Sequence, residues 1–230
     1  MAEEAARFAI DALAAAGIDG ATVVELGCGS GQTAARLGEA GHEVIGIDSS
    51  PHMLTLAREA APKARLVLGS IHATPIPPCD LVLAVGEVLS YRFPGDEDAS
   101  ATALLDRAVR ALRPGGMLVF DVAAPGRASG RGHVLGDGWA VLVDAREDRA
   151  AATLVREIVT FRRMGDAWRR SDEVHRLALL SPSGLAAHLR RRGLSARILR
   201  GYGAGELGLG WRVIAARARG GVRRAARPRS

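Results

Sequence analysis

The stretch Thr22-Val-Val-Glu-Leu26, followed at once by Gly27-Cys-Gly-Ser-Gly31, decides the fold of this 230-residue chain. Thr22–Leu26 is a short apolar run of the kind that forms a buried strand. The glycines after it predict a sharp turn in which the backbone can approach a ligand without interference from a Cβ atom. A helix is expected from the turn to about Ala40, where Gly41 ends it. A strand, a glycine-rich turn and a helix in this order are typical of α/β sheets that bind nucleotides.

The alternation of strand and helix continues along the chain. Helices are expected over residues 3–16, after Ser50-Pro51 and around Ser100–Leu112, and Arg113-Pro-Gly-Gly116 is expected to be a turn. The remaining strands of this half are expected at Glu43–Ile47, Arg65–Leu68, Asp80–Val85 and Met117–Val122. Such repeated β-α units predict a parallel sheet that is covered by helices on both faces.

The pattern changes after Pro125. A glycine-rich loop (Gly126–Gly138) is expected to lead into three antiparallel strands, with a hairpin turn at residues 164–167. These three strands are expected at Trp139–Ala145, Thr153–Arg163 and Trp168–Leu179. Ser181-Pro182 opens another helix, and two strands, Ser195–Arg200 and Trp211–Arg217, follow it. We therefore expect one domain over residues 1–218 with an inserted lid at about 126–180.

Charge and composition limit the partners that we expect. The net charge is +6, but residues 219–230 hold five arginines and no acid, which leaves about +1 for the rest. We interpret residues 219–230 as a basic disordered tail. We expect no membrane partner, because no apolar run approaches the ~20 residues that a membrane helix needs. Two cysteines and an acidic N-terminus favour a cytoplasmic protein, and no ligand spacing suggests a metal.

An acidic residue at the end of the second strand supports a nucleotide site. Asp48 lies 23 positions after Glu25, which suits a carboxylate that accepts hydrogen bonds from ribose hydroxyls. A dinucleotide site of the G-x-G-x-x-G type would need a glycine where this chain has Gln32. A nicotinamide oxidoreductase therefore fits poorly, although a glycine turn alone does not exclude it.

Three stretches in order resemble the motifs of class I S-adenosylmethionine-dependent methyltransferases. They are Val23–Gly31, Val44–Met53 and Leu112–Asp121, and the resemblance runs over about residues 20–123. It implies an α/β, Rossmann-like sheet of seven strands, mostly parallel with the last strand antiparallel, plus the small antiparallel lid insert. It also implies methyl transfer, with S-adenosylmethionine as cofactor, S-adenosylhomocysteine as product and no metal.

The resemblance implies cofactor roles for residues at the carboxyl ends of the strands. Glu25 and the glycine turn would hold the methionine part, Asp48 the ribose hydroxyls, and Ser49 and Met53 would border the adenine. The full set of expected cofactor-binding residues is Glu25, Gly27, Cys28, Gly29, Gly31, Gln32, Asp48, Ser49, Met53, Ser70, Ile71, Val85 and Gly86. Many members of the family have an aspartate after the third strand, whereas this chain has Gly69-Ser70-Ile71, which makes adenine recognition less certain than ribose recognition.

Three residues are candidates for catalysis. Glu87 and Tyr91 follow the fourth strand, and His175 lies in the lid. Glu87 could bind an acceptor ammonium or take a proton, Tyr91 could line the acceptor pocket, and His175 titrates near neutral pH. The alternative for each is structural: a surface carboxylate, a packing aromatic and a hydrogen-bonded histidine.

The acceptor is expected to be a small molecule that is methylated on N or O. The chain contains no asparagine, so the Asn-Pro-Pro-Tyr signature of methyltransferases that act on base amino groups and glutamine is absent. RNA methylation through the arginine tail, and a non-catalytic protein that binds S-adenosylmethionine, are the alternatives. We do not expect a nucleic-acid partner, and the sequence leaves the oligomeric state open.

Overall fold

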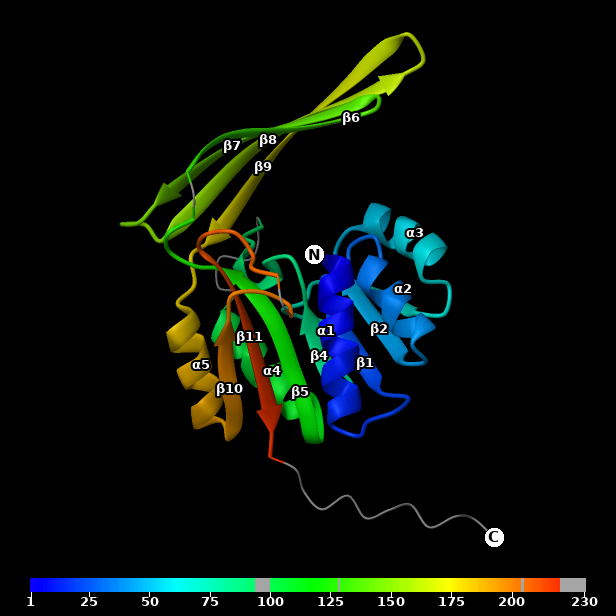
Figure 1. Ribbon diagram of the computed structural model, residues 1–230, viewed down its shortest axis with the longest axis vertical. Coiled ribbons are helices and arrows are strands. Elements are labelled where there is room, and N and C mark those ends of the chain that lie inside the picture. The colour runs from blue at the N-terminus through cyan, green and yellow to red at the C-terminus, as the bar shows by residue number, and fades with distance from the viewer. Residues whose placement is uncertain (94–99, 128, 204, 220–230) are drawn as a thin grey trace.

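The computed structural model describes residues 1–93, 100–127, 129–203 and 205–219 of the chain (Figure 1). Its main sheet has seven strands in the order β10-β11-β5-β4-β1-β2-β3. Strand β11 is antiparallel to both of its neighbours, and the other described pairs are parallel. The predicted seven-stranded sheet with an antiparallel last strand is confirmed. Its strands are β1 (Thr22–Leu26), β2 (Glu43–Asp48), β3 (Arg65–Leu68), β4 (Cys79–Ala84), β5 (Leu112–Ala123), β10 (Leu194–Leu199) and β11 (Trp211–Ala218).

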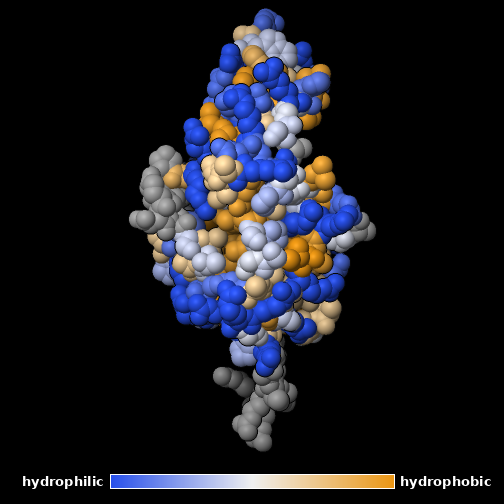
Figure 2. Space-filling view, turned by 90° about the vertical axis from the view of Figure 1, so that its left-hand side faces the viewer, coloured by the Kyte–Doolittle hydropathy of each residue, from blue (hydrophilic) through white to orange (hydrophobic). Residues whose placement is uncertain are grey.

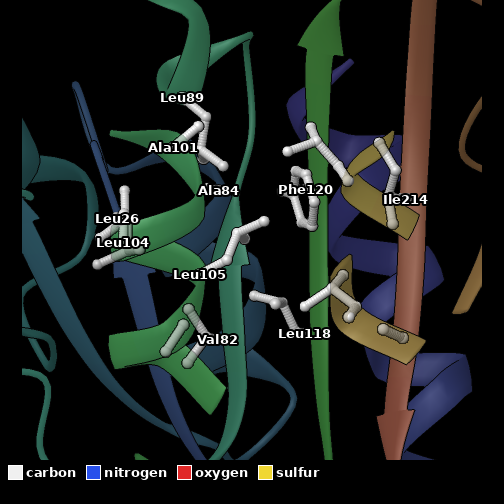
Figure 3. Close-up of a cluster of buried hydrophobic side chains, with 14 of the residues drawn as sticks. Leu26, Val82, Ala84, Leu89, Ala101, Leu104, Leu105, Leu118, Phe120 and Ile214 are labelled. Atoms are coloured by element: carbon white, nitrogen blue, oxygen red, sulfur yellow. The ribbon is translucent and has the colours of Figure 1, made fainter. Parts of the chain in front are cut away.

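Helices cover both faces of this sheet. On one face, α1 (Ala2–Ala15) and α2 (Gln32–Glu39) bury Ala9, Leu13 and Leu37 against the strands. On the other face, α4 (Ala101–Ala111) and α5 (Pro182–Arg191) pack around Phe120 of β5 (Figure 3). A third helix on the first half of the chain, α3 (Pro51–Ala60), lies beside α2, β2 and β3. Successive side chains of a strand point to opposite faces of the sheet, so the buried strands contribute to two hydrophobic cores, one on each face.

Serine side chains cap three of the helices, two of which, at Ser50 and Ser181, the sequence predicts. The hydroxyls of Ser50, Ser100 and Ser181 accept hydrogen bonds from backbone N–H groups three residues later, at 3.3, 3.3 and 3.1 Å. Proline follows two of them, at the first position of α3 and of α5. These caps satisfy donors that a helix would otherwise leave unpaired, so they fix where each helix begins.

The predicted turn at residues 113–116 is wrong in one respect. The structure assigns it to β5, which starts at Leu112 and pairs there with Cys79. The next pair is Leu81 with Met117, so residues 113–116 lie opposite the single residue Asp80, and β5 has three extra residues there. The bend that Pro114 and Gly115 encode is therefore present, but the strand pairs on both sides of it.

A second sheet of four antiparallel strands is inserted between β5 and α5 and extends away from the main sheet (Figure 1). It consists of β6 (Gly130–Gly136), β7 (Trp139–Asp148), β8 (Thr153–Met164) and β9 (Ala167–Ala178). Three of these strands and the 164–167 hairpin match the expectation. The interpretation of residues 126–138 as a loop is wrong, because Gly130–Gly136 pairs with β7 along its length. A strand edge needs only backbone groups for this pairing, so glycines do not prevent it.

The surface of the inserted sheet mixes apolar and charged side chains (Figure 2). Its exposed large apolar residues include Val134, Leu135, Trp139 and Trp168. Among the described residues, no helix combines the length and the apolar character that crossing a bilayer requires. Residues 220–230, most of the predicted basic tail, lie outside the described residues.

Candidate functional site

The glycine turn between β1 and α2 has the backbone conformation that the sequence predicts. Gly27, Gly29 and Gly31 all have positive φ values, of 67°, 53° and 78°. The amides of Gly27 and Cys28 donate to the carbonyl oxygen of Ile47, at 2.7 and 3.1 Å, which joins the turn to the end of β2. At Gly31 a Cβ atom would lie only 2.9 Å from the Cα atom of Ala57 in α3, so this position requires glycine.

The carboxylate of Asp48 is held at the edge of this turn by two backbone amides. Gly29 N donates to its Oδ2 atom at 2.8 Å, and Ser50 N donates to its Oδ1 atom at 2.9 Å. Each carboxylate oxygen has a second lone pair that can still accept a hydrogen bond. Asp48 can therefore accept hydrogen bonds from two neighbouring hydroxyls of a sugar, as expected from its position after β2.

A cavity of about 660 Å³ opens at the carboxyl ends of the strands, beside Asp48. The structure gathers many of the residues that were expected to bind cofactor or acceptor around it: Gly27, Gly29, Asp48, Ser49, Met53, Ser70, Ile71, Val85, Gly86 and Tyr91. The sequence did not single out the other lining residues for this site: Ser50, His72, Val88, Phe93 and Glu173. Six other residues that were expected to bind cofactor or to act in catalysis do not line the cavity: Glu25, Cys28, Gly31, Gln32, Glu87 and His175. The cavity volume falls within the range of ordinary small-molecule sites.

Ser70 and Ile71, which stand where many family members have an aspartate, lie on the cavity wall. The Ser70 hydroxyl already accepts a hydrogen bond from His72 N, at 3.2 Å. The guanidinium of Arg107, on α4, donates to the carbonyl oxygen of Ile71 at 3.1 Å and also contacts the carbonyl groups of His72 and Thr74. Arg107 thus holds this wall in place from behind, which the sequence pattern gave no means to predict.

Glu25 is buried beneath the glycine turn, with 2% of its surface exposed. One carboxylate oxygen, Oε2, has no hydrogen-bond partner among the described residues. Burial raises the pKa of Glu25 to about 8; a hydrogen bond from Thr33 acts in the opposite direction, and the charge of Asp48 raises the pKa further. A buried acceptor without a partner is costly, so this position favours a cation or a hydrogen-bond donor close by.

The loop after β4 is fixed by Asp121, the buried acid near the end of β5. Its carboxylate accepts from Gly86 N and Glu87 N, at 2.9 and 2.5 Å. It also accepts from the Tyr202 hydroxyl at 2.5 Å and from Trp211 Nε1 at 2.8 Å. Four donors satisfy this carboxylate completely, so Asp121 positions the Gly86 wall of the cavity. The sequence signal for Asp121 is a single acid in an otherwise apolar strand, and this signal alone does not indicate which groups the acid binds.

Glu87 lies beneath the inserted sheet and is 1% exposed. Its Oε2 atom accepts from Arg156 at 3.0 Å, and Arg127 approaches its Oε1 atom to 3.1 Å. Desolvation raises the pKa of Glu87, and both arginines act in the opposite direction. The catalytic role stays a prediction; the contacts in the structure are to these two arginines.

Tyr91 and His175, the other two catalytic candidates, come together from the segment after β4 and from β9. The Tyr91 hydroxyl lies 3.4 Å from His175 Nδ1, and His175 Nε2 lies 3.0 Å from Glu173 Oε2. The Tyr91 ring stacks on Phe93, with ring centroids 5.7 Å apart and an angle of 7° between the planes. Desolvation raises the pKa of Tyr91. Tyr91, Phe93 and Glu173 line the cavity, so these side chains form its end near the inserted sheet.

The residues around the cavity fit the expected S-adenosylmethionine. Its amino and sulfonium groups are cationic, and Glu25 offers an unpaired buried carboxylate oxygen below the turn. Asp48 offers two carboxylate oxygens to the ribose, and Met53 and Ile71 offer apolar surface to an adenine. Among the described residues, no cluster of three or more histidine, cysteine or acidic side chains could hold a metal ion.

Comparisons with known proteins agree with this geometry. Residues 23–116 match the methyltransferase domain family. Trans-aconitate 2-methyltransferase of Azoarcus sp. (strain BH72) is 38% identical over 125 residues, which cover 53% of this chain and 47% of that protein. The chain therefore spans about half the length of this curated relative.

Solved structures match over nearly the whole chain. A S-adenosylmethionine-dependent methyltransferase from Clostridium acetobutylicum ATCC 824 superimposes with a TM-score of 0.81 at 17% identity, over 96% of this chain and 93% of that one. An amino pentose methyltransferase from Micromonospora echinaspora, with S-adenosylmethionine bound, superimposes with a TM-score of 0.74 at 21% identity, over 94% and 91% of the two chains. At these identities the likeness establishes the fold.

Proposed function

We propose that this chain transfers a methyl group from S-adenosylmethionine to a nitrogen or oxygen atom of a small-molecule acceptor. Residues 23–116 match the methyltransferase domain family, and the chain has the class I methyltransferase fold. The observation that carries this proposal is the placement of the Asp48 carboxylate. Two backbone amides orient it at the mouth of the glycine turn, on the wall of a cavity of about 660 Å³.

The reaction needs little from the protein beyond alignment and exclusion of water. S-adenosylmethionine, when bound, supplies a methyl group that its sulfonium already activates. Asp48 would hold the ribose, Glu25 would lie near the methionine part, and the Gly86 backbone, fixed by Asp121, would border the reacting end. Tyr91 and Phe93 would line the acceptor side, where the inserted sheet covers the cavity.

Calorimetry with purified protein tests the cofactor site. We expect one S-adenosylmethionine to bind per chain, and Asp48→Asn to weaken the affinity by about 1–3 kcal/mol through lost charge-assisted hydrogen bonds. Glu39→Gln is the matched control, because Glu39 is an exposed acid paired with Arg36 on α2. Absence of binding by the wild-type protein, or equal affinity in the wild type and Asp48→Asn, would contradict the proposal.

The alternatives that the sequence leaves open differ in their products. A non-catalytic binding protein would retain cofactor affinity and release no S-adenosylhomocysteine with any acceptor, which mass spectrometry measures. RNA methylation rests on the arginines of residues 219–230, most of which lie outside the described residues. A cytoplasmic location is also our proposal; it is supported by two cysteines, Cys28 and Cys79, that are both free thiols.

A further inference from the structure

The described residues that line the cavity include no lysine or arginine, although the chain has 31 of them. The acidic residues of the wall are Asp48 and Glu173, and its one histidine among the described lining residues is His72. Asp48 belongs to the cofactor end of the cavity. Glu173 is therefore the charged group left to the acceptor, and it lies with Tyr91 and Phe93 at the other end. A carboxylate beside aromatic rings is a favourable environment for a cation and an unfavourable one for an anion.

The two arginines close to this end are paired with Glu87, and the guanidinium carbon of Arg156 also lies over the Tyr91 ring, 5.9 Å from its centroid. Arg127 and Arg156 both face the Glu87 carboxylate, at 3.1 and 3.0 Å, and neither lines the cavity. Arg127 also lies over the Trp211 ring, 4.6 Å from its centroid. The carboxylates of Glu87 and Asp121 both raise the pKa of Arg127, so acidic groups offset part of the positive charge beside the acceptor end.

We propose that the acceptor is an amine that enters as an ammonium ion, and that Glu173 and the Tyr91–Phe93 pair bind it. This inference rests on the proposed function, since it names the acceptor class of the same site. The residues that would bind the ammonium come from two segments, because Glu173 lies on β9 of the inserted sheet and Tyr91 follows η1 (Val88–Ser90) in the segment after β4. The acceptor end is complete only when the inserted sheet is in place.

The same residues provide a route for the proton that an ammonium must lose. Glu173 Oε2 lies 3.0 Å from His175 Nε2 and selects the tautomer in which Nε2 carries the hydrogen. Nδ1 is then an acceptor, and it faces the Tyr91 hydroxyl at 3.4 Å. Glu173 is thus a positioning residue for His175, and His175 acts on the acceptor through Tyr91.

The step balances in atoms and charge. The ammonium gives one proton to the Tyr91 oxygen as the Tyr91 hydroxyl gives its own proton to His175 Nδ1, which leaves a neutral amine and a cationic imidazole. The nitrogen lone pair then forms the bond to the methyl carbon while the carbon–sulfur bond breaks and its electron pair stays on sulfur. The products are the methylated ammonium and neutral S-adenosylhomocysteine, and His175 later returns its proton to solvent.

A paired panel of acceptors tests the amine class. The purified full chain and S-adenosylmethionine are incubated with amines (cyclohexylamine, benzylamine and glucosamine) and with acids (cyclohexanecarboxylate, benzoate and trans-aconitate), and products are identified by mass spectrometry. We expect N-methylated amines and no methyl esters. Methyl esters, or no methylated amine from a protein that binds S-adenosylmethionine in calorimetry, would overturn the amine proposal and leave the cofactor site intact. Failure to bind S-adenosylmethionine would instead overturn the proposed function.

Variants separate proton transfer from a structural role. His175→Gln should lower kcat for an alkylamine by about 100-fold, the usual size of a general-base contribution, but should leave kcat for an arylamine, which is unprotonated at neutral pH, within about threefold. Glu173→Gln should raise KM for alkylamines about tenfold. Glu173→Asp, which keeps the carboxylate, should raise KM by a smaller factor. Asp172→Asn, on the same strand and paired with Arg170, is the matched control. An equal loss for both amine types in His175→Gln, or an unchanged KM in Glu173→Gln, would overturn the assignment.

Discussion

Two carboxylates at the glycine turn differ because of their burial. Asp48 lines the cavity and accepts two backbone N–H groups. Glu25 is enclosed beneath the turn and keeps one oxygen without a partner among the described residues, and its pKa is raised to about 8. Burial penalises the charged form of a carboxylate, whereas amide hydrogen bonds favour it. The same carboxyl chemistry therefore gives one acceptor for the ribose on the cavity wall, Asp48, and one buried acid, Glu25, that holds its proton near neutral pH.

Binding of S-adenosylmethionine should release a proton from Glu25. The nearby cationic groups favour its ionised form, so the release is expected below pH 8, where the free protein is still protonated. Calorimetry at pH 7 in buffers of different ionisation enthalpy measures the release. Glu25→Gln should abolish it, and an identical buffer dependence in this variant would show that the proton comes from elsewhere.

Glu25 should also make the ligand-free protein less stable as the pH rises. The folded state holds the proton up to about pH 8, whereas the unfolded carboxyl loses it near pH 4.5. The unfolded state therefore binds fewer protons between these values, and the free energy of unfolding falls across this window. Urea unfolding at several pH values should give a smaller fall in Glu25→Gln; an equal fall would contradict the role of Glu25.

Two glycines of the turn should respond differently to alanine. At Gly29 a Cβ atom meets nothing within 4 Å, and the residue lines the cavity. At Gly31 it would lie against the backbone of Ala57. Gly29→Ala should cost about 1–2 kcal/mol of unfolding free energy from its left-handed backbone alone and should weaken cofactor binding. Gly31→Ala should cost more stability, as urea unfolding measures; a larger loss at Gly29 would contradict this reading of the turn.

At the scale of elements, the inserted sheet is fastened to the main sheet by polar and apolar contacts at its base. Arg92 N donates to the carbonyl oxygen of Arg176 on β9, at 2.8 Å, and Tyr91 forms a bridge with Leu177. Leu154 and Leu177, both 1% exposed, pack there against Ala123. These contacts at the base of the inserted sheet hold it beside the cavity of the main domain, so that Glu173 can form part of the cavity wall.

Glu87 is the polar centre of this attachment. Glu87→Gln would leave Arg127 and Arg156 without their carboxylate, so we expect the free energy of unfolding to fall by about 3 kcal/mol, as for other buried ion pairs that lose one partner. Glu157→Gln is the control, because Glu157 is a half-exposed acid of the same sheet and pairs with Arg146. Urea unfolding compares the two; equal stabilities would show that the Glu87 cluster does not fasten the sheet.

At the scale of the whole molecule, the positive charge is concentrated at one end of the chain. Residues 219–230 carry five of the arginines that produce the net charge of +6. Charge of this kind governs non-specific association with nucleic acid, and its effect depends on salt. The cofactor and acceptor contacts described above involve none of these residues.

Deletion of residues 219–230 should therefore leave methyl transfer to a small amine unchanged. We expect kcat and KM within about twofold of the wild-type values at both low and high salt, because no long-range charge effect on the cavity is involved. Filter binding of RNA by both forms completes the comparison. Loss of turnover on deletion, together with salt-dependent RNA binding by the full chain, would favour the RNA alternative.

The main sheet and the end of the cavity beside the glycine turn could be predicted from the sequence. Apolar runs, helix caps and glycines act over a few neighbouring residues, and parallel strands bring their carboxyl ends to one edge. Gly27, Asp48 and Ser70 therefore reach the same cavity from the ends of three strands. The strand Gly130–Gly136 was not predicted, because its glycines are typical of a loop. Its pairing with β7 uses backbone groups, which every residue type in this segment provides.

The acceptor end of the cavity depends on tertiary packing. Tyr91 and His175 are 84 positions apart and meet because the base of the inserted sheet packs on the segment after β4 and on the end of β5. This packing also brings Arg156 to Glu87. Separately, packing within the main domain gives Asp121 four donors from three segments. Such contacts depend on how separate elements pack, and hydrophobic periodicity within each element carries no information about which polar groups will face one another.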